Sequence, residues 1–279
     1  MRATLLLVAA VACGGTPATP PPSAPATRVV SLAPSITEIA FALGAGERLV
    51  GVCGQCDYPD DVARLPRVGG YLAPSVEVAL ALRPDLVVAV PSPGNREAVR
   101  AIERAGTRVL VVQDRTLADL WASIRALAPA LGVPDAAERL IDDVQHRLAA
   151  VHARVAALPT RRVLMIVGHQ PLVAVGRGTL QDELLTTAGG VNVAADAGTV
   201  WPTITLELVV DRAPDVIVDA AMGTEAGARE LFAGLSTVPA VRDGRIVRLR
   251  NDAVFRAGPR VGEAAAALAA AIHPEASAG

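Results

Sequence analysis

The chain has 279 residues, of which 52% are hydrophobic, and its 26 basic and 28 acidic residues give a formal charge of −2. This balance offers no basic surface for DNA or RNA and excludes nucleic acid as the main partner. Every basic residue is an arginine, which excludes chemistry that depends on a lysine, such as a phosphate-loop lysine or a Schiff base. The length suits one large domain or two moderate ones.

The N-terminus has the pattern of a secretory signal. One cation, Arg2, precedes an apolar run from Leu5 to Ala12 that is too short to span a bilayer. Small residues before Cys13 resemble a bacterial lipobox, which predicts a signal peptide over residues 1–12 and lipidation of Cys13; an ordinary signal peptide cut near Cys13 is the alternative. The proline-rich residues 13–27 predict an extended tether. We therefore expect a lipid-anchored protein in the periplasm or at the cell surface.

From Arg28 onward, short β-branched runs alternate with helical patterns, which predicts parallel α/β units. In the first half we expect a helix that opens with a capping box of Ser35 and Glu38 and ends at Leu43, and another helix over residues 96–104. The strands expected in this half are Val29–Leu32, Leu49–Val52, Asp85–Val90 and Arg108–Val112.

A long helical pattern follows. Residues 135–158 carry apolar side chains at helical spacing with no internal glycine or proline, which predicts one helix of about 35 Å. A second α/β series then begins, with strands expected at Val163–Val167, Val216–Val218 and Ile246–Leu249. The predicted organisation is an N-terminal α/β lobe over residues 28–134, a connecting helix over 135–158 and a C-terminal α/β lobe over 159–279.

A repeat with an offset of 130 positions supports two similar lobes. In the first copy Tyr71 lies six positions before Glu77, and a Pro-Asp pair seven positions after the glutamate leads into a strand. Trp201 and Glu207 have the same spacing in the second copy. Two such lobes joined by one rigid helix define a cleft, where an aromatic side chain from each lobe suits a flat or bulky ligand. The glutamates are expected at helix starts, either as a matched pair of anions for a symmetric partner or as ordinary first-turn charges.

The chain also resembles a known family, in segments distributed from Arg28 to Ile272. These segments include Arg28–Glu38, Cys56–Pro59, Val68–Tyr71, Pro74–Glu77, Ala188–Asn192, Trp201–Pro202 and Gly258–Arg260. Together they resemble the periplasmic binding proteins for vitamin B12, haem and iron-siderophores. The resemblance implies a substrate-binding protein of an ABC importer, with little hinge closure, that delivers its ligand to a permease dimer with ATPase subunits. We expect it to act as a monomer.

Within that family the chain looks most similar to the cobalamin-binding branch, which implies a corrinoid ligand, with haem or a ferric siderophore as the alternative. By position, Tyr58, Tyr71 and Trp201 match aromatic residues that line the corrinoid cleft. Asp252 and Arg256 match a polar pair on the C-terminal lobe.

The resemblance further implies that Glu77 and Glu207 bind arginines of the permease. The segments His169–Leu172 and Ala253–Phe255 depart from the family pattern.

Several residues leave alternatives open. In an oxidising compartment Cys53 and Cys56 favour a local disulfide or inert thiols over a ligand-contacting loop, and over thiol redox or metal chemistry. His169 ends a predicted strand and, if it faces the cleft, could approach cobalt or haem iron; a solvated loop histidine is the alternative. The phenol of Tyr71 could bind haem iron or only contact the ligand. The histidines predicted on the surface are His146, His152 and His273.

No catalytic arrangement is apparent in the sequence. It has no nucleophile elbow with a Ser-His-Asp set, no paired carboxylates in a catalytic context and no complete glycine-rich phosphate loop. We therefore expect a binding protein, not an enzyme, with no catalytic cofactor and no directly assigned metal ligand. The alternatives from other classes are a periplasmic thiol redox protein that uses Cys53 and Cys56, and a structural lipoprotein without a small-molecule ligand.

Overall fold

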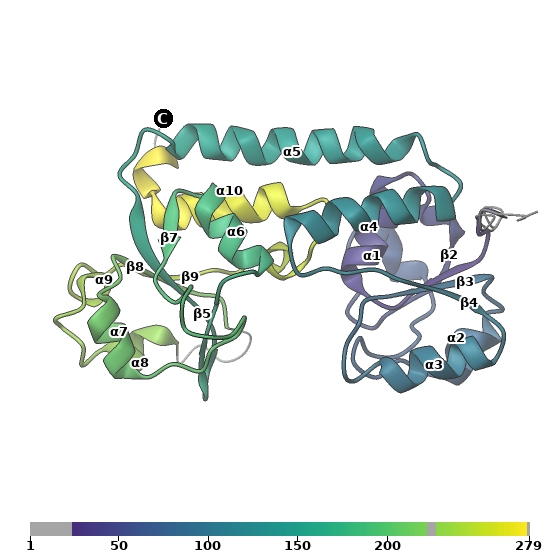
Figure 1. Ribbon diagram of the computed structural model, residues 1–279, viewed down its shortest axis with the longest axis horizontal. Helices are drawn as coiled ribbons and strands as arrows, with labels where there is room; N and C mark the ends of the chain where they lie inside the picture. The colour runs from purple at the N-terminus through teal and green to yellow at the C-terminus, as the bar shows by residue number, and fades with distance from the viewer. Residues whose placement is uncertain (1–23, 222–226, 278–279) are drawn as a thin grey trace, which may run out of the picture.

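The computed structural model describes residues 24–221 and 227–277, which form two α/β lobes side by side beneath one long helix (Figure 1). This arrangement confirms the predicted fold class. The predicted signal peptide, Cys13 and most of the tether lie outside the described residues. The end of the predicted tether belongs to the folded body instead, because Ala26 is buried and its N–H donates to the carbonyl of Ala130 at 2.8 Å.

The N-terminal lobe is built on a parallel four-stranded sheet with the order β2-β1-β3-β4. Its strands are β1 Val29–Ser31, β2 Leu49–Val52, β3 Leu86–Ala89 and β4 Arg108–Val111, close to the predicted ranges. Val29 packs with α1 and α4, whereas its neighbour Val30 packs with α2 and α3, so helices cover both faces. These helices are α1 Pro34–Ala42, α2 Val76–Ala81, α3 Arg96–Arg104 and α4 Leu117–Ala130.

The C-terminal lobe has a five-stranded sheet with the order β6-β5-β8-β9, in which β7 pairs with the start of β5 and only β6 is antiparallel. The strands are β5 Arg161–His169, β6 Leu172–Ala174, β7 Gly190–Asn192, β8 Val216–Asp219 and β9 Ile246–Arg248. One face is covered by α6 Leu180–Thr187 and α10 Val261–Ile272, and the other by α7 Leu206–Arg212, α8 Ala228–Phe232 and α9 Pro239–Arg242. The sequence predicted β5, β8 and β9, but not the three-residue strands β6 and β7.

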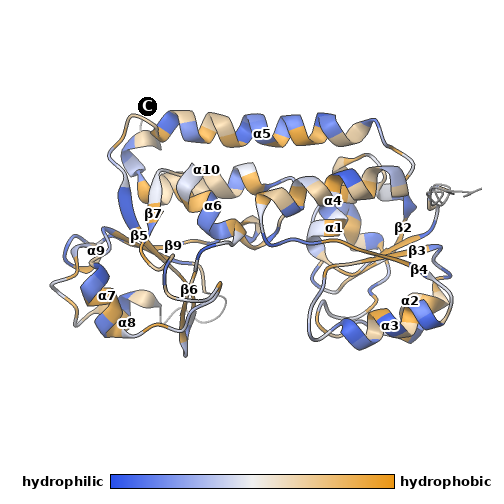
Figure 2. Cartoon of the chain, viewed as in Figure 1, coloured by the Kyte–Doolittle hydropathy of each residue, from blue (hydrophilic) through white to orange (hydrophobic). Residues whose placement is uncertain are grey.

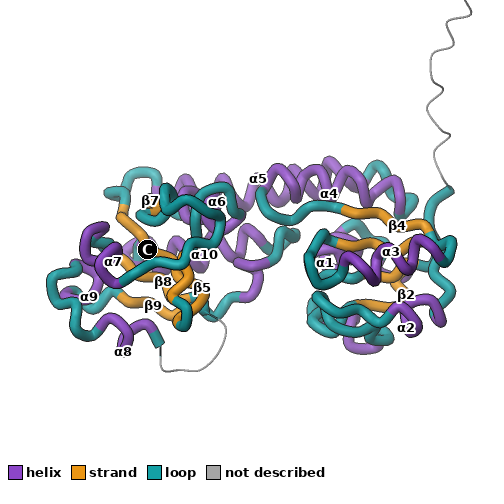
Figure 3. The backbone as a smooth tube through the Cα atoms, turned by 60° about the horizontal axis from the view of Figure 1, so that its bottom comes forward, coloured by secondary structure: helices purple, strands orange, loops and turns teal. Residues whose placement is uncertain are grey.

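The long helix α5, Ala136–Val155, joins the two lobes and lies within the predicted range. Its polar face is outward and its apolar face lies on α4 of one lobe and α10 of the other (Figure 2). The buried side chains repeat every three or four residues and are Ala137, Ile141, Val144, Leu148, Val151 and Val155. These residues belong to one hydrophobic cluster that continues into both lobes. A second view shows α5 extending along both lobes, with α4 beside it over the N-terminal lobe (Figure 3).

The repeat seen in the sequence is a structural repeat. Ser75 and Thr205, 130 positions apart, cap α2 and α7 by accepting hydrogen bonds from the backbone N–H three residues on. Asp85 and Asp215, again 130 apart, each accept a backbone N–H at the start of a strand, at 3.1 Å from Arg28 and 2.8 Å from Arg162. The Pro-Asp pair therefore fixes the entry of the first strand in each lobe.

The backbone repeats as well, because Arg83 and Ala213, also 130 positions apart, both have positive φ angles, of 48° and 39°. This left-handed conformation is uncommon for residues other than glycine. Because it recurs at the same position of the repeat, α2 and α7 are each followed by a left-handed residue before the Pro-Asp pair.

Two predictions about individual residues are wrong. Helix α1 begins at Pro34 with Ala33 as its N-cap, so Ser35 and Glu38 lie inside the helix, are buried and form no capping box. Proline at the first helical position satisfies the start of the helix without a side-chain cap. His273 is also not a surface residue, since it is 0% exposed and its ring nitrogens lie near the Gly189 carbonyl and the Glu275 carboxylate.

Within the described residues, every helix is too short or too polar to cross a lipid bilayer.

Candidate functional site

A pocket of about 260 Å³ lies between the lobes. Its walls include Tyr71 from the N-terminal lobe and Trp201 and Phe255 from the C-terminal lobe. Trp201 is 43% exposed and Phe255 37% exposed, so both present apolar surface to whatever enters. The remaining lining residues are Asp114, Arg115, Thr179, Gln181 and Val200. The structure therefore brings together two of the predicted aromatic residues, Tyr71 and Trp201, and adds Phe255.

Close backbone approaches hold both predicted aromatic residues in place. Gly69, two residues before Tyr71, has φ of 98°, and a Cβ there would lie 2.7 Å from the Ser75 nitrogen. A Cβ on Gly176 would lie 2.0 Å from the carbonyl oxygen of Thr199 in the segment that carries Trp201. Only glycine fits these two positions without moving the pocket walls.

Burial in the pocket wall raises the pKa values of two ionisable groups, Asp114 and Tyr71. Burial, with a contribution from the nearby carboxylate of Asp119, raises the pKa of Asp114 to about 6. Burial and the charge of Asp114 raise the pKa of the Tyr71 phenol above its usual value. Tyr71 is therefore held as a neutral phenol in the unliganded pocket.

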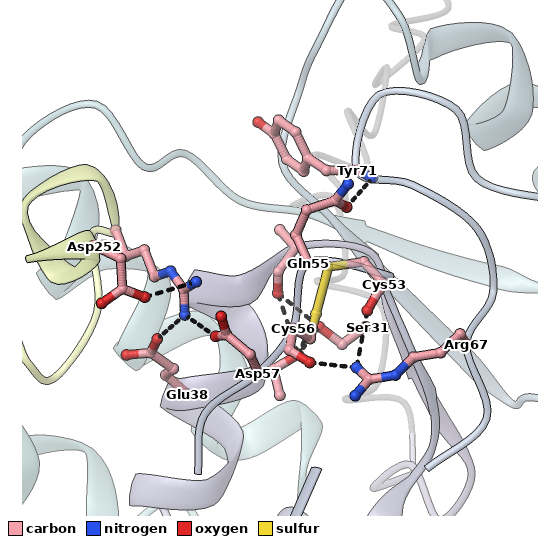
Figure 4. Close-up of a disulfide and its surroundings, with 12 residues drawn as sticks. Ser31, Glu38, Cys53, Gln55, Cys56, Asp57, Arg67, Tyr71 and Asp252 are labelled. Atoms are coloured by element: carbon pink, nitrogen blue, oxygen red, sulfur yellow. Dashed lines mark hydrogen bonds and ion pairs between the residues drawn. A yellow bond between two sulfur atoms is a disulfide. The ribbon is translucent and has the colours of Figure 1, made fainter. Parts of the chain in front are cut away.

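Next to this pocket, an ion-pair network crosses from one lobe to the other. The carboxylate of Glu38, 1% exposed on α1, accepts two hydrogen bonds from Arg260, at 2.7 and 3.0 Å, and one from Arg256 at 2.8 Å. Arg256 also binds Asp57 at 2.6 Å and Asp252 at 2.8 Å. Figure 4 shows Glu38, Asp57 and Asp252 around this one guanidinium group.

The predicted polar pair, Asp252 and Arg256, belongs to this ion-pair network. Asp252 and Arg256 do form an ion pair on the C-terminal lobe, but Arg256 is 12% exposed and its guanidinium already binds three carboxylates. The hydrogen bond from Arg256 holds the pKa of the Asp57 carboxyl below its usual value. Arg256 therefore joins the lobes and is absent from the lining of the aromatic pocket.

Tyr58 is separated from the other predicted aromatic residues. It lines a different hollow of about 420 Å³, against α5, α1 and the start of α10. The guanidinium carbon of Arg260 lies 4.2 Å from the centre of the Tyr58 ring, which is a cation–π contact. Tyr58 thus contacts the interlobe arginine, and the structure places it in a different hollow from the one lined by Tyr71 and Trp201.

His169 is paired within its own lobe. Its Nε2 lies 3.0 Å from Oδ1 of Asp219, and Oδ2 of the same carboxylate accepts a hydrogen bond from Arg248 at 2.8 Å. Burial opposes ionisation of Asp219, but the hydrogen bonds from Arg248 and from backbone N–H groups lower its pKa. Asp219 lines a hollow inside the C-terminal lobe, and His169 is not among the residues that line the aromatic pocket.

Cys53 and Cys56 form a disulfide, and each residue is 1% exposed. Such burial gives an external thiolate no path to the sulfur atoms, which argues against a thiol redox centre. Among the described residues, no group of three or more His, Cys, Asp or Glu side chains could hold a metal ion.

Glu77 and Glu207 are exposed in the first turns of α2 and α7, as predicted. Hydrogen bonds from its own backbone N–H and from Thr205 lower the pKa of the Glu207 carboxyl. Both helices lie on the side of the lobes away from α5 (Figure 1).

The sequence matches the profile of one protein family, described as periplasmic binding protein, over residues 29–253. The chain belongs to the periplasmic binding protein family. Members of this family are solute-binding proteins of ABC transporters. This chain is therefore an ABC transporter substrate-binding protein.

Three relatives illustrate the similarity. The vitamin B12-binding protein of Salmonella typhimurium is 33% identical over 248 residues, which cover 88% of this chain and 90% of that protein. An uncharacterized ABC transporter substrate-binding lipoprotein of Bacillus subtilis, YvrC, is 32% identical over 89% of this chain and 80% of its own length. The structure of the periplasmic haem-binding protein RhuT from Roseiflexus sp. RS-1, in its apo form, has a TM-score of 0.79 and 35% identity, covering 89% of this chain and 98% of that one.

Sequence reasoning missed three residues that shape the site. Phe255 stood out only as a departure from the family pattern, and Asp114 lies in a loop without a motif. Glu38 was assigned to a capping box, although Pro34 just before Ser35 is the signal that the helix starts earlier.

Replacing Glu38 tests the interlobe network. We expect Glu38→Gln to lower the free energy of unfolding by about 3 kcal/mol, because two largely buried guanidinium groups lose their shared anion. The same change at Glu97, whose pair with Arg100 is exposed, is expected to cost less than about 1 kcal/mol. Urea unfolding of both variants measures the difference; equal costs would show that the network contributes no more than a surface ion pair.

Asp114 predicts a dependence of stability on pH. Because its folded pKa is raised to about 6, the folded state binds the proton more tightly than the unfolded state, and stability is lost as pH rises from 4 to 7. Asp114→Asn should therefore become more stable relative to wild type over this range, by about 2 to 3 kcal/mol at pH 7.5. Urea unfolding between pH 4.5 and 8 measures it, with Asp142→Asn on exposed α5 as the control; a gap that does not change with pH contradicts the assignment.

Proposed function

We propose that this protein captures a corrinoid of the vitamin B12 type in the pocket between its lobes and delivers it to an ABC permease. The observation that carries the proposal is the set of three aromatic side chains, Tyr71, Trp201 and Phe255, contributed by both lobes to one pocket. Aromatic rings bury large area at low entropic cost and suit a broad macrocycle. The similarity to vitamin B12-binding proteins over most of the chain supports the same ligand class.

The charges of the pocket favour a corrinoid over more anionic ligands. Among the eight residues that line the pocket, Arg115 is the one cation, and Asp114 is the one carboxylate. Haem carries two propionates and ferric siderophores are often anionic, so both would need a surplus of positive charge. A corrinoid whose side chains are mostly amides needs none.

Haem is the second candidate, because the phenol of Tyr71 lies in the pocket wall and the haem-binding protein RhuT has a similar fold. Tyrosine can bind haem iron as the phenolate. Against this, burial and Asp114 raise the phenol pKa, so iron binding would have to overcome the cost of ionising Tyr71.

Delivery would use the exposed surface of α2 and α7. Glu77 and Glu207 occupy equivalent positions there, and exposed apolar side chains lie beside them: Val78 on α2, and Leu206 and Val210 on α7. Anions with adjacent apolar surface suit a protein partner that presents two arginines. Lipidation of Cys13 and the proline-rich tether would hold the protein near the membrane that contains the permease.

Replacing two aromatic side chains of the pocket should strongly weaken corrinoid binding. Titration calorimetry of residues 24–279 with cyanocobalamin is expected to show one tight site, with haem as a parallel titrant. The double variant Tyr71→Ala, Trp201→Ala should bind at least about 100-fold more weakly, since two ring contacts are lost. Val191→Ala on β7, where the residue is 52% exposed, is the control and should retain binding within about threefold. Full retention by the double variant would refute the site, whereas binding of haem alone, with a Soret band from tyrosinate-bound iron, would make haem the ligand.

Charge reversal should separate binding from delivery. Glu77→Arg combined with Glu207→Arg is expected to leave corrinoid affinity unchanged and to weaken association with the permease by about tenfold or more, because like charges then face each other. Uptake into vesicles that contain the permease measures this, with Glu97→Arg on exposed α3 as the control. Unchanged uptake by the double variant would rule out these glutamates as the docking residues.

A further inference from the structure

The loop closed by the disulfide is anchored at its base. Arg67 donates hydrogen bonds to the carbonyl oxygens of both Cys53 and Cys56, the former at 3.2 Å. The Thr37 hydroxyl on α1 lies 3.2 Å from the Cys56 sulfur and 2.8 Å from the hydroxyl of Ser31 at the end of β1. The two cysteines are therefore fixed to the first strand, the first helix and the segment after β2.

From this base, the loop reaches the segment that carries Tyr71. The side-chain oxygen of Gln55 accepts the backbone N–H of Tyr71 at 2.7 Å, and the N–H of Gly54 donates to the carbonyl of Gly69 at 2.7 Å (Figure 4). Tyr71 itself lies outside any helix or strand. Its phenol points away from the disulfide, so the loop holds the backbone of Tyr71 and leaves the ring free to face a ligand (Figure 4).

The same loop also reaches the opposite wall of the pocket. Asp57, next to Cys56, binds Arg256 of the C-terminal lobe at 2.6 Å. Arg256 directly follows Phe255, which lines the pocket. Gln55 and Asp57 thus flank Cys56. Gln55 contacts Tyr71 in the N-terminal wall of the pocket, and Asp57 contacts Arg256, the neighbour of Phe255 in the C-terminal wall.

We propose that the Cys53–Cys56 loop sets the geometry of the ligand pocket, with Gln55 as the positioning residue for Tyr71. The proposal rests on the pocket of the proposed function. The disulfide restricts the conformation of the residues between the cysteines. The side-chain oxygen of Gln55 is thereby held within hydrogen-bonding distance of the Tyr71 N–H. No electron transfer is involved, in agreement with the burial of both cysteines.

A series at Gln55 tests the proposal. Gln55→Ala removes the acceptor and should weaken cyanocobalamin binding about fivefold to tenfold, whereas Gln55→Glu keeps an oxygen acceptor and should bind within about twofold of wild type. Gln145→Ala, an exposed glutamine on α5, is the matched control. Amide hydrogen exchange at Tyr71 should be faster in Gln55→Ala and unchanged in Gln55→Glu.

The disulfide is tested by Cys53→Ser combined with Cys56→Ser. If this variant folds, it should show the same faster exchange at Tyr71 and at least the same loss of affinity as Gln55→Ala. If it does not fold, the Gln55 series decides alone.

The exchange readout separates this inference from the proposed function. If wild type binds neither cyanocobalamin nor haem, the proposed function fails, while Tyr71 exchange still supports or refutes the role of Gln55. Unchanged exchange at Tyr71 in Gln55→Ala would overturn the inference, as would equal effects of the alanine and glutamate variants.

Discussion

The relation between the two lobes depends on the carboxylate of Glu38. It comes from the first helix of the chain, it is almost fully buried, and it is shared by two arginines from the end of the chain. A buried carboxylate without partners would be strongly unfavourable, and so would two buried guanidinium groups. Glu38 therefore requires the two arginines, which also pair with Asp252 of their own lobe. The shared carboxylate favours the arrangement of the lobes in which Tyr71 and Trp201 line one pocket.

The regular elements could be predicted from the sequence because their signals are local. Buried parallel strands give short β-branched runs, and the amphipathic face of α5 repeats every three or four residues. Strands β6 and β7 were not predicted because each contains a single β-branched residue, whereas β1 and β9, which are also three residues long, contain two. The repeat could be found because matching caps, glutamates and Pro-Asp pairs recur at one offset in both lobes.

The candidate site was only partly predictable, since its decisive contacts join distant parts of the chain. Glu38 and Arg256 are 218 positions apart, and nothing near either residue indicates the other. Local pattern therefore suggested a capping role for Glu38, and the family resemblance implied a ligand-binding role for Arg256. The family resemblance implied that Tyr71 and Trp201 share a cleft, and both residues line the pocket between the lobes. It could not distinguish Tyr58, whose ring is occupied by Arg260.

The single hydrophobic cluster that runs through α5 into both lobes has a consequence for kinetics. Spreading or closing the lobes would disrupt packed apolar contacts along the helix, which opposes a change in the width of the entrance. In the proposed function, a receptor without an opening step would bind its ligand at a rate set by diffusion and orientation. The lifetime of the complex would then distinguish a well-fitting ligand from a poor one, and release would require work applied by the transporter.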